Sequence, residues 1–563
     1  MWLKFRSQVE TALKEGLGEL KIASEKLYLE VPPAGFGELA SSVCMTLARD
    51  LGRKPYDIAK DLQAAISERG EKYPLIDKIE VDGPGYLNFF LNIGKAGPSI
   101  VDEILDQKGD YGKVNLGRGA KTLLEHTSAN PDGPLHIGHL RNSILGDTIA
   151  RILRFTGHDI VVETYVNDCG RLMAITCWEY QRERTTPEGK GDNWVVDIYI
   201  RGNKRIEEVG PEEAMRLLRE YEKGSHLADF KLLVDAALEG HKETLAKLGI
   251  THDEYIWESQ FIRDGTAQKL VDRIEKRPDA IRDGSLLALD LSKAGFRKEF
   301  MIRRSDGSLL YSAKDLAHHF YYKTEKAKRS IIILGSDHKL HYAHMKTALK
   351  ILGCKTDFEV VHYEFISLPG GQMSTRKGNF ISVDNLLSEA KARAFEEVKK
   401  RRKDLRVAEK EKIAESVAVG ALRYAISSVS PEKPIMFKWE DALDFDKSSA
   451  PALQYTYART SRILEKTKKK PNKGFVPQSE QEKRLVIHLA KFPEIVTQSS
   501  TSLRPHLITA YAGELNFLFR DFYSKCKVIG SKEEPERLAL VQATRQTLGN
   551  ILGLLGIPAL EKM

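Results

Sequence analysis

Residues 123–153 decide the fold and read LLEHTSANPDGPLHIGHLRNSILGDTIARIL. The opening apolar residues predict a short strand that ends at Glu125, and apolar residues spaced three and four apart beyond His139 predict an amphipathic helix. His136 and His139 therefore stand on either side of Gly138 at the start of a helix that follows a strand. This position attracts anions, because the first backbone N–H groups of a helix are unpaired and the helix dipole favours negative charge.

Spacing alone leaves two interpretations of these histidines open. Their rings could donate hydrogen bonds to phosphate oxygens where charge develops in a reaction, with Gly138 allowing a ligand to approach the backbone. They could equally do no more than cap the helix and pack against it. The pattern itself does not choose between these roles.

The composition predicts a soluble protein of several domains. A chain of 563 residues is too long for one hydrophobic core and suggests three or four domains. A hydrophobic content of 42% and a charged content of 29% are ordinary for a globular protein. No apolar run reaches the ~20 residues that span a membrane, and the charged N-terminus lacks the apolar core of a signal peptide.

Cysteine usage and net charge bear on the cellular setting. The five cysteines are odd in number, scattered and without a Cys-x-x-Cys spacing. This argues against a disulfide framework or a zinc ribbon and favours a reducing cytoplasm. The formal charge of +8, from 87 basic and 79 acidic residues, permits a nucleic-acid partner without establishing one.

The patterning divides the chain into three expected domains. Residues 1–112 predict an α+β module, residues 113–435 a parallel-sheet domain and residues 436–563 an all-helical domain. A second buried strand over residues 158–166 completes a βαβ unit, whose ligands bind at the carboxyl ends of the strands. Charged helical patterns over about 170–295 predict an insertion into this domain.

Within the N-terminal module, the apolar spacing over Glu38–Asp50 predicts an amphipathic helix that ends near Gly52. A second helix is expected to begin at Pro55, since proline suits a first helical turn. Residues 78–81 and 86–91 around Asp-Gly-Pro-Gly predict two strands joined by a turn.

A β-hairpin is predicted over residues 300–311, around an Asp-Gly turn, with a helix following from Ser312. Ser312 and Asp315 lie three apart, which approximates a capping box, so Asp315 could be a helix-capping carboxylate. The sequence at this point leaves other roles for Asp315 open.

A buried strand is predicted over residues 329–335, and it places Asp337 and His338 at its carboxyl end, where a ligand is expected. A metal site is a weaker alternative, because no second cluster of ligand residues supports it. Its members would be Asp337, His338, His341 and His344.

Two basic segments could contact phosphate. Residues 367–380, SLPGGQMSTRKGNF, form a glycine-flanked basic loop whose backbone can move and whose cations can neutralise phosphate; an ordinary basic surface loop is the alternative. Residues 399–403, KKRRK, are either a solvated helix face or a track for a nucleic-acid backbone.

The HIGH sequence, preceded by SANPDGPL and followed by LRNS, resembles the ATP motif of class I aminoacyl-tRNA synthetases and, more narrowly, of arginyl-tRNA synthetases. The resemblance covers nearly the whole chain. It includes GFGELA and GPGYLNF near the N-terminus, MSTRKG in the basic loop, and the helices at residues 450–464 and 514–523. It implies a Rossmann-type catalytic domain with an insertion, an N-terminal α+β domain that contacts tRNA, and a C-terminal helical bundle that binds the anticodon.

The resemblance implies an arginine–tRNA ligase. ATP, as its magnesium complex, and arginine would form arginyl-adenylate, from which the arginyl group passes to tRNA. It further implies that tRNA must be bound before arginine is activated, and that the protein is a cytoplasmic monomer without a membrane partner or a structural metal.

Carried over residue by residue, the resemblance assigns three sets of positions. Catalytic and ATP-binding roles fall to His136, Gly138, His139, Met373, Ser374, Arg376 and Lys377. Arginine binding falls to Glu125, Asn130, Tyr311, Asp315, Asp337 and His338, of which Glu125 could instead be a solvated strand end. For RNA contacts the resemblance gives Met563, which matches a C-terminal residue near the anticodon in relatives; Tyr455, Tyr457, Phe519 and Tyr523 are candidates because RNA bases stack on aromatic rings, although most aromatics at helical spacing belong to a core.

The chain departs from the family at one motif. Gln372 and Thr375 stand where the KMSKS loop of the family carries its two lysines, so Arg376 and Lys377 are the nearest replacements. Two rivals follow: another class I synthetase, and a tRNA-binding paralogue that has lost activity. A carboxylate-lined pocket suits a cationic substrate and argues against the first, while the intact histidines argue against the second.

Overall fold

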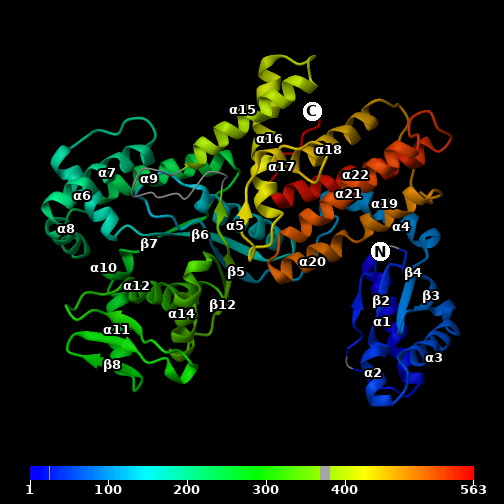
Figure 1. The fold of residues 1–563 in the computed structure, drawn as a ribbon, viewed down its shortest axis with the longest axis horizontal. Helices are drawn as coiled ribbons and strands as arrows, with labels where there is room; N and C mark the ends of the chain where they lie inside the picture. Colours follow the sequence, from blue (N-terminus) through cyan, green and yellow to red (C-terminus); the bar gives the residue numbers. More distant parts are fainter. Residues whose placement is uncertain (25, 34, 368–380) are drawn as a thin grey trace.

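The computed structural model describes residues 1–24, 26–33, 35–367 and 381–563 (Figure 1). Its centre is a five-stranded sheet in the order β12-β11-β5-β6-β7, in which every neighbouring pair is parallel. The strands are β5 (Lys121–Glu125), β6 (Asp159–Val166), β7 (Glu254–Trp257), β11 (Arg329–Gly335) and β12 (Asp357–Tyr363). The predicted strands of the βαβ unit and the strand over residues 329–335 are thereby confirmed.

The helix of the HIGH sequence, α5 (Ile137–Phe155), lies across this sheet and is almost entirely buried. Its apolar side packs on β5, β6 and β11 through a core that includes Leu145, Ile149 and Leu153. A glycine on the same side, Gly146, faces the side chain of His126 at the end of β5. A parallel sheet buried in this way brings the carboxyl ends of its strands, and the start of α5, to one edge.

The segment between β6 and β11 has two parts separated by β7; the insertion expected over about 170–295 covers the first part and the beginning of the second, and α14, which follows β11, packs with the second part. A helical part packs α6 to α9 together, and a lower lobe contains a second, antiparallel sheet of order β10-β9-β8 (Figure 1). The helical part comprises α6 (Arg171–Glu183), α7 (Gly191–Val209), α8 (Glu212–Glu222) and α9 (Leu227–Lys247). The lobe comprises α10 (Gln260–Arg263), α11 (Thr266–Glu275), β8 (Ala280–Asp283), β9 (Leu286–Leu289), β10 (Phe300–Arg303), α12 (Tyr311–Ala317), a π-helix (His318–Lys323), α13 (Thr324–Lys326) and α14 (Lys339–Ile351).

The predicted hairpin over residues 300–311 is confirmed in a short form: the Arg304 N–H bonds the Ser308 carbonyl at 2.9 Å, the Leu310 N–H bonds the Ile302 carbonyl at 3.0 Å, and Arg303 and Leu309 form an antiparallel bridge. The sequence did not predict that β10 also pairs with β9. The partner strand comes from earlier in the chain, which a local turn pattern cannot reveal. The Asp-Gly turn itself is present, since Gly307 has a φ of 84° and its N–H bonds the carbonyl of Arg304 at 3.0 Å.

The N-terminal module is an α+β domain with an antiparallel sheet of order β1-β2-β4-β3. The helix predicted over Glu38–Asp50 is wrong in its first part, because residues 39–41 form a buried strand paired with β4 and the helix begins only at Val43. A short apolar run fits either structure, and the free edge of β4 decides it. The helix from Pro55 and the two later strands are confirmed. The elements are α1 (Trp2–Glu19), β1 (Leu29–Glu30), β2 (Leu39–Ser41), α2 (Val43–Leu51), α3 (Pro55–Ser67), β3 (Ile76–Asp82), β4 (Tyr86–Leu91) and α4 (Ile93–Gln107).

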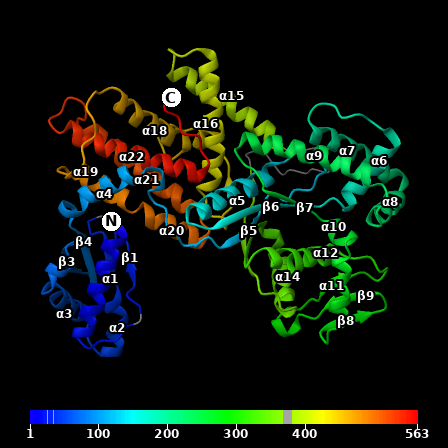
Figure 2. The ribbon, with the colours of Figure 1, turned by 180° about the vertical axis from the view of Figure 1, so that it is seen from behind.

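The C-terminal region is helical and shares a continuous core with the N-terminal domain, which projects beside it (Figure 2). Tyr111 donates a hydrogen bond to the Leu489 carbonyl at 2.8 Å, and the Trp2 indole donates one to the Glu494 carboxylate. Within the described ranges, no helix has the length and apolar character needed to cross a membrane. The elements that follow β12 in the chain are β13 (Ile366–Ser367), α15 (Val383–Arg401), α16 (Val407–Ser427), β14 (Ile435–Met436), α17 (Trp439–Ala442), α18 (Ala450–Glu465), α19 (Glu480–Ala490), α20 (Phe492–Ser502), α21 (His506–Lys525) and α22 (Glu534–Leu555).

The close contact between α5 and the end of β5 makes a prediction about stability. A Cβ at Gly146 would lie 2.4 Å from the Cβ of His126, so Gly146→Ala forces His126 to shift and should cost about 1–3 kcal/mol. Thermal unfolding should show a lower Tm. Gly553→Ala in α22 is the matched control, because among the described residues an added Cβ there would meet no atom within 4 Å outside its own turn of helix, and it should gain roughly 0.5–1 kcal/mol. Equal effects of the two substitutions would contradict this account of the packing.

Candidate active site

The two histidines of the HIGH sequence form a reciprocal cap at the start of α5. The His136 Nδ1 accepts a hydrogen bond from the Gly138 N–H at 3.1 Å, and the His139 Nδ1 accepts one from the His136 N–H at 3.3 Å. Their rings stack with centroids 3.7 Å apart. A Cβ at Gly138 would lie 2.9 Å from the His136 ring, so the glycine makes room for the ring itself.

The capping role does not exclude a ligand-binding role. Burial lowers the pKa of both rings, that of His139 most strongly, so both are neutral at pH 7. A neutral ring whose Nδ1 accepts carries its proton on Nε2, and each histidine therefore keeps one N–H donor. Two neutral donors fixed at a helix start suit the oxygens of a polyphosphate.

A pocket of about 340 Å³ opens in front of this cap. It lies at the carboxyl edge of the sheet, between the ends of β5, β11 and β12, where a parallel sheet binds its ligands. Its lining residues are Thr127, Ser128, His136, Ile137, Gly138, His139, Asn142, Ile333, Leu334, Gly335, Asp337, His338, Tyr363, Phe365 and Ile366. Phe365 is an exposed aromatic ring on the pocket wall, and an apolar ring at such a place can stack on a base.

The backbone beside this pocket is strained. Thr127 and Ser128 both have positive φ angles, of 70° and 37°, directly after β5. Such residues cost about 1–3 kcal/mol each and persist only where their surroundings hold them. Here Asn142 Oδ1 accepts the Thr127 N–H at 2.6 Å, and Thr164 Oγ1 accepts the Ser128 N–H at 3.1 Å.

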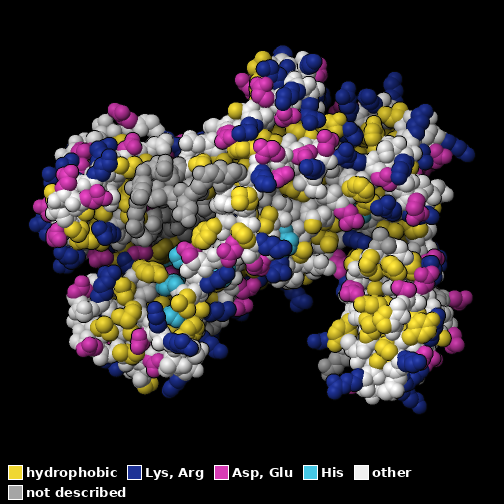
Figure 3. Space-filling view, viewed as in Figure 1, with side chains coloured by type: hydrophobic (Ala, Val, Ile, Leu, Met, Phe, Trp, Pro, Cys, Tyr) yellow, Lys and Arg dark blue, Asp and Glu magenta, His cyan; other side chains and the backbone are white. Residues whose placement is uncertain are grey.

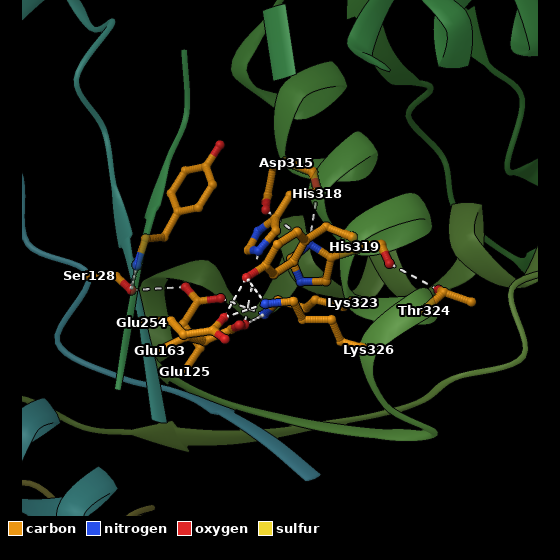
Figure 4. Close-up of polar contacts among 12 residues, drawn as sticks. Glu125, Ser128, Glu163, Glu254, Asp315, His318, His319, Lys323, Thr324 and Lys326 are labelled. Atoms are coloured by element: carbon orange, nitrogen blue, oxygen red, sulfur yellow. Dashed lines mark hydrogen bonds and ion pairs between the residues drawn. The ribbon is translucent and has the colours of Figure 1, made fainter. Parts of the chain in front are cut away.

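A buried charge cluster lies below the end of β5 (Figure 4). The Lys323 ammonium is 2.5 Å from Glu125 and 3.0 Å from Glu163, and the Ser128 hydroxyl donates to Glu125 at 2.9 Å. Glu125 is only 7% exposed, so the interpretation of it as a solvated strand end is wrong. Burial opposes the charge of Lys323, but the carboxylates of Glu125 and Glu163 raise its pKa. Burial also raises the pKa of Glu163.

His318 completes this cluster. Its ring is fully buried and stacks on Tyr165, and neither of its nitrogens has a hydrogen-bond partner among the residues that the structure describes. Burial lowers its pKa far below the usual value, so it is neutral.

The ring lies among carboxylates that could in principle hold a metal ion. The groups that bring their ligand atoms within 4.8 Å of one another, in the part of the chain that the structure describes, are Asp315, His318 and His319, and Glu125, Glu163 and His318. Lys323 already provides a cation between Glu125 and Glu163. The metal set suggested by the sequence at Asp337, His338, His341 and His344 is not one of these groups.

Asp315 lies on α12 and faces two imidazoles. His319 Nδ1 is 3.1 Å from its carboxylate and His341 Nε2 is 3.8 Å away. Burial opposes the charge of Asp315, but these two histidines lower its pKa, and the carboxylate is ionised. The capping interpretation is wrong, since Leu310 is the N-cap of α12 and no side chain caps it. The Ser312 hydroxyl bonds the Met301 carbonyl instead.

The remaining sequence-derived positions fall in several places. Tyr311 is half exposed, with its ring against His341 at 4.8 Å. Asn130 is exposed in the loop before α5. Asp337 and His338 lie in the pocket beside the two capping histidines. The positions in the second basic loop, which are Gln372, Met373, Ser374, Thr375, Arg376 and Lys377, lie outside the described residues.

The insertion braces the loops that frame the pocket. His241 of α9 donates from Nε2 to the Gly133 carbonyl at 2.7 Å, in the loop just before α5. Asp384, in the first turn of α15, accepts hydrogen bonds at 2.6–2.8 Å from Lys190, Thr244 and Lys247. The start of α15 also meets the HIGH sequence, because the Val383 N–H bonds the Leu135 carbonyl at 2.8 Å.

A second pocket, of about 890 Å³, lies between α18, α21 and the C-terminus. The guanidinium of Arg459 lies over the rings of both Tyr455 and Tyr523 in this pocket, at 4.6 and 5.2 Å. Met563 also lines it. Tyr457 lies elsewhere, packed on the core under Arg545, and Phe519 is fully buried.

Basic residues gather over this helical domain at the upper right of Figure 3.

The run at residues 399–403 fits the interpretation as a solvated helix face better than that as an RNA contact. Lys399, Lys400 and Arg401 face the glutamates of their own helix at 3.5, 2.7 and 3.7 Å.

Sequence reasoning missed three members of the buried cluster, namely Glu163, His318 and Lys323. Glu163 carried a usable signal, because an acidic residue inside the otherwise apolar strand VVETYV is costly unless it is paired. His318 and Lys323 carried none, since their helix reads as an ordinary polar one and their partners come from β5 and β6.

Comparisons with known proteins agree with this architecture along the whole chain. Residues 100–439 match the family described as "tRNA synthetases class I (R), catalytic domain". Residues 4–91 match the "Arginyl tRNA synthetase N terminal domain" and residues 453–563 the "DALR anticodon binding domain".

Relatives match at full length. The arginine–tRNA ligase of Methanothermobacter thermautotrophicus is 42% identical, over 98% of this chain and 99% of its own. That of Methanocella arvoryzae is 39% identical over 100% of both chains. Among solved structures, the arginyl-tRNA synthetase of Thermus thermophilus has a TM-score of 0.85 at 28% identity, with 99% of this chain and 100% of its own covered.

The parallel sheet, the capping histidines at its carboxyl edge and the matched catalytic domain define a class I aminoacyl-tRNA synthetase. Within that class, the matches of the N-terminal and C-terminal domains and the full-length relatives identify one family. The chain belongs to the arginyl-tRNA synthetase family. The predicted fold class is thereby confirmed as well.

Two buried neutral histidines in contact with each other, His126 after β5 and His252 before β7, predict how stability depends on pH. Burial lowers the pKa of His252 to about 4 and that of its neighbour His126 further. An unfolded imidazole has a pKa of about 6.5, so below that value the unfolded state binds more protons and the free energy of unfolding falls as pH drops. For His252 the loss between pH 7 and 4 should reach up to about 3 kcal/mol.

Thermal unfolding between pH 7 and 5 measures this effect as the difference between wild type and variant, because buried carboxyls such as Asp132, whose pKa burial raises to about 6, titrate in the same window in both. His252→Gln should flatten the slope of Tm against pH in that window. An unchanged slope would show that this histidine is protonated as readily in the folded protein as in the unfolded chain.

Proposed function

We propose that the protein ligates L-arginine to tRNA in two steps, through an arginyl-adenylate. The arginine carboxylate attacks the α-phosphorus of ATP, pyrophosphate leaves, and a ribose hydroxyl of the tRNA terminus then takes the arginyl group. The carboxylate is already a nucleophile, so the reaction needs positioning and charge stabilisation more than a general base. The observation that supports this best is the pocket at the carboxyl edge of the sheet, closed on one side by the neutral HIGH histidines.

ATP, bound as its magnesium complex, is proposed to occupy this pocket. The Nε2–H groups of His136 and His139 donate hydrogen bonds to phosphate oxygens. These bonds become stronger as negative charge develops on the oxygens in the transition state. Phe365 offers a stacking face to the base, and Asp337 and His338 complete the pocket. Met373, Ser374, Arg376 and Lys377 are proposed to contact the phosphates from the second loop.

Arginine is proposed to bind between Asp315 and the end of β5. A planar guanidinium prefers a fixed, ionised carboxylate, and His319 and His341 keep Asp315 in that state. Tyr311 and Asn130, both exposed, are proposed to contact the remainder of the substrate. Glu125, held by Lys323 and Ser128, is proposed to receive the α-ammonium group.

The tRNA is proposed to contact the helical domain at Tyr455 and Met563, on the pocket where Arg459 also stacks on Tyr523. Aromatic faces beside guanidinium groups are the chemistry that holds splayed bases. Tyr457 is a weaker candidate because it packs on the core. We further propose that arginine activation needs bound tRNA, and that the protein acts as a cytoplasmic monomer.

The proposed ligation predicts arginine-dependent exchange of pyrophosphate into ATP. Exchange should require both arginine and tRNA, and His139→Ala should lower its rate by about 10²–10³, the usual effect of removing one donor to a developing charge. The assay compares wild type and variant with and without tRNA. Retained tRNA binding without exchange in the wild type would favour the inactive paralogue.

The proposed role of Asp315 predicts that its substitution lowers the catalytic efficiency for arginine and leaves ATP binding unchanged. Asp315→Asn removes the charged partner of the guanidinium and should cost about 2–5 kcal/mol, which lowers kcat/KM for arginine by roughly 30-fold or more while KM for ATP stays unchanged. Asp306→Asn is the matched control, since Asp306 is exposed in the turn before α12 and its carboxylate accepts hydrogen bonds from the N–H and the hydroxyl of Ser308. An unchanged KM for arginine in Asp315→Asn would remove Asp315 from the pocket.

A further inference from the structure

Arg141 is a buried cation whose hydrogen bonds go to backbone carbonyls. It lies two residues after His139 on α5 and is 1% exposed. Nη1 donates to the carbonyl of Glu364 and, at 3.4 Å, to that of Phe365. Nη2 donates to the carbonyls of Ser430, Pro431 and Lys433, at 3.3, 3.3 and 2.8 Å.

This arrangement is electrostatically unusual. A buried charge is normally paired with an opposite charge, yet Arg141 forms no ion pair with any carboxylate in the described part of the chain. The equally buried Arg423 does, with Asp147. Burial lowers the pKa of Arg141 to about 10, so it stays charged at pH 7 and five carbonyl dipoles must stabilise it. Those carbonyls are therefore drawn to one point in space.

One group of these carbonyls belongs to the wall of the nucleotide pocket. Phe365 and the next residue, Ile366, both line that pocket. The carboxylate of Glu364 accepts hydrogen bonds from Ser336 at 2.9 Å and from Lys339 at 3.2 Å. These two residues flank Asp337 and His338, which line the pocket as well.

The other group belongs to the junction with the helical domain, residues 428–436, which leads away from α16. Glu432 pairs with Arg504, just before α21, at 2.9 Å. At the end of α16, the Ser427 carbonyl accepts the Thr509 hydroxyl of α21 at 3.5 Å. The junction and the pocket wall also bond each other, because the Glu364 N–H donates to the Pro431 carbonyl at 2.9 Å and Ile366 pairs with Ile435.

We infer that Arg141 is a positioning residue that couples the helical domain to the nucleotide pocket. One guanidinium, two residues after His139, binds both the pocket wall at residues 364–365 and the domain junction at residues 430–433. A shift of the junction therefore displaces this part of the pocket wall. RNA binding on the helical domain and ATP binding in the pocket then favour the same arrangement of this segment. This inference rests on the proposed function and supplies a physical route for the tRNA requirement.

The fork shape of the side chain is essential to this role. Arginine presents five N–H donors in a rigid plane, whereas a lysine ammonium is a compact point with three. Arg141→Lys keeps the charge but cannot reach both segments at once. Thermodynamic linkage turns this into a measurement, because ATP must change the Kd of tRNA by the factor by which tRNA changes the Kd of ATP.

The experiment measures the Kd of tRNA with and without a saturating non-hydrolysable ATP analogue. In the wild type the analogue should tighten tRNA binding by about fivefold or more, and in Arg141→Lys by less than twofold. Arg423→Lys is the matched control, because its carbonyl partners, Leu555 and Leu248, do not line the pocket. It should lower the Tm but keep the wild-type factor. Equal loss of the factor in both variants, or its retention in Arg141→Lys, would overturn the inference.

Hydrogen exchange of the wild-type protein tests the same point without a variant. The ATP analogue should slow amide exchange in residues 428–436 by at least about fivefold when tRNA is bound. Unchanged exchange there would overturn the inference even if Arg141→Lys failed to fold. Arginine-dependent pyrophosphate exchange separates the two proposals: if it is present without any linkage, only the coupling fails, and if it is absent, the ligase assignment fails.

Discussion

The seating of α5 on the parallel sheet is the constraint on which the rest of the structure depends. Its first residues hold the two capping histidines, its second turn carries Arg141 and Asn142, and Gly146 lets it approach the end of β5. Further along, Asp147 binds Arg423 of α16, where the helical region begins to pack. A single helix therefore fixes the nucleotide pocket, the strained backbone after β5 and the contact between domains. A substitution at most positions of α5 would therefore disturb a contact with another element.

The charged groups in the buried cluster at the end of β5 depend on one another, because removing one would leave its buried partner without a counter-charge. Glu125 and Glu163 share one ammonium, and His318 beside them is neutral. With both carboxylates ionised, this buried group carries one negative charge in excess. In the function proposed above, the cationic groups of arginine balance that charge. This cluster lowers the stability of the fold, since the attraction within a buried ion pair seldom exceeds the desolvation free energy of its two charges.

Much of this could be predicted from sequence, because it depends on local pattern. The strands of the βαβ unit, the helix start at HIGH and the helix at Pro55 follow from apolar period and turn chemistry. The failures share a cause. The strand at residues 39–41 and the pairing of β10 were decided by the free edges of β4 and β9, which lie elsewhere in the chain. Lys323 and Arg141 were missed because their partners are distant carboxylates and backbone carbonyls, and carbonyls leave no trace in composition.

Arg141 also shows why a charge can be kept where an apolar residue would be more stable. A leucine in its place would avoid the desolvation of a guanidinium, but the carbonyls of Glu364 and Lys433 would lose this donor. The two segments would keep main-chain bonds such as that from the Glu364 N–H to the Pro431 carbonyl, without the side-chain link between them. Apolar packing tolerates small sliding, whereas a planar fork with five donors fixes direction as well as distance. In the proposed coupling, a ligand that binds at one segment changes the position of the other, and this transmission depends on the rigidity of the link between them.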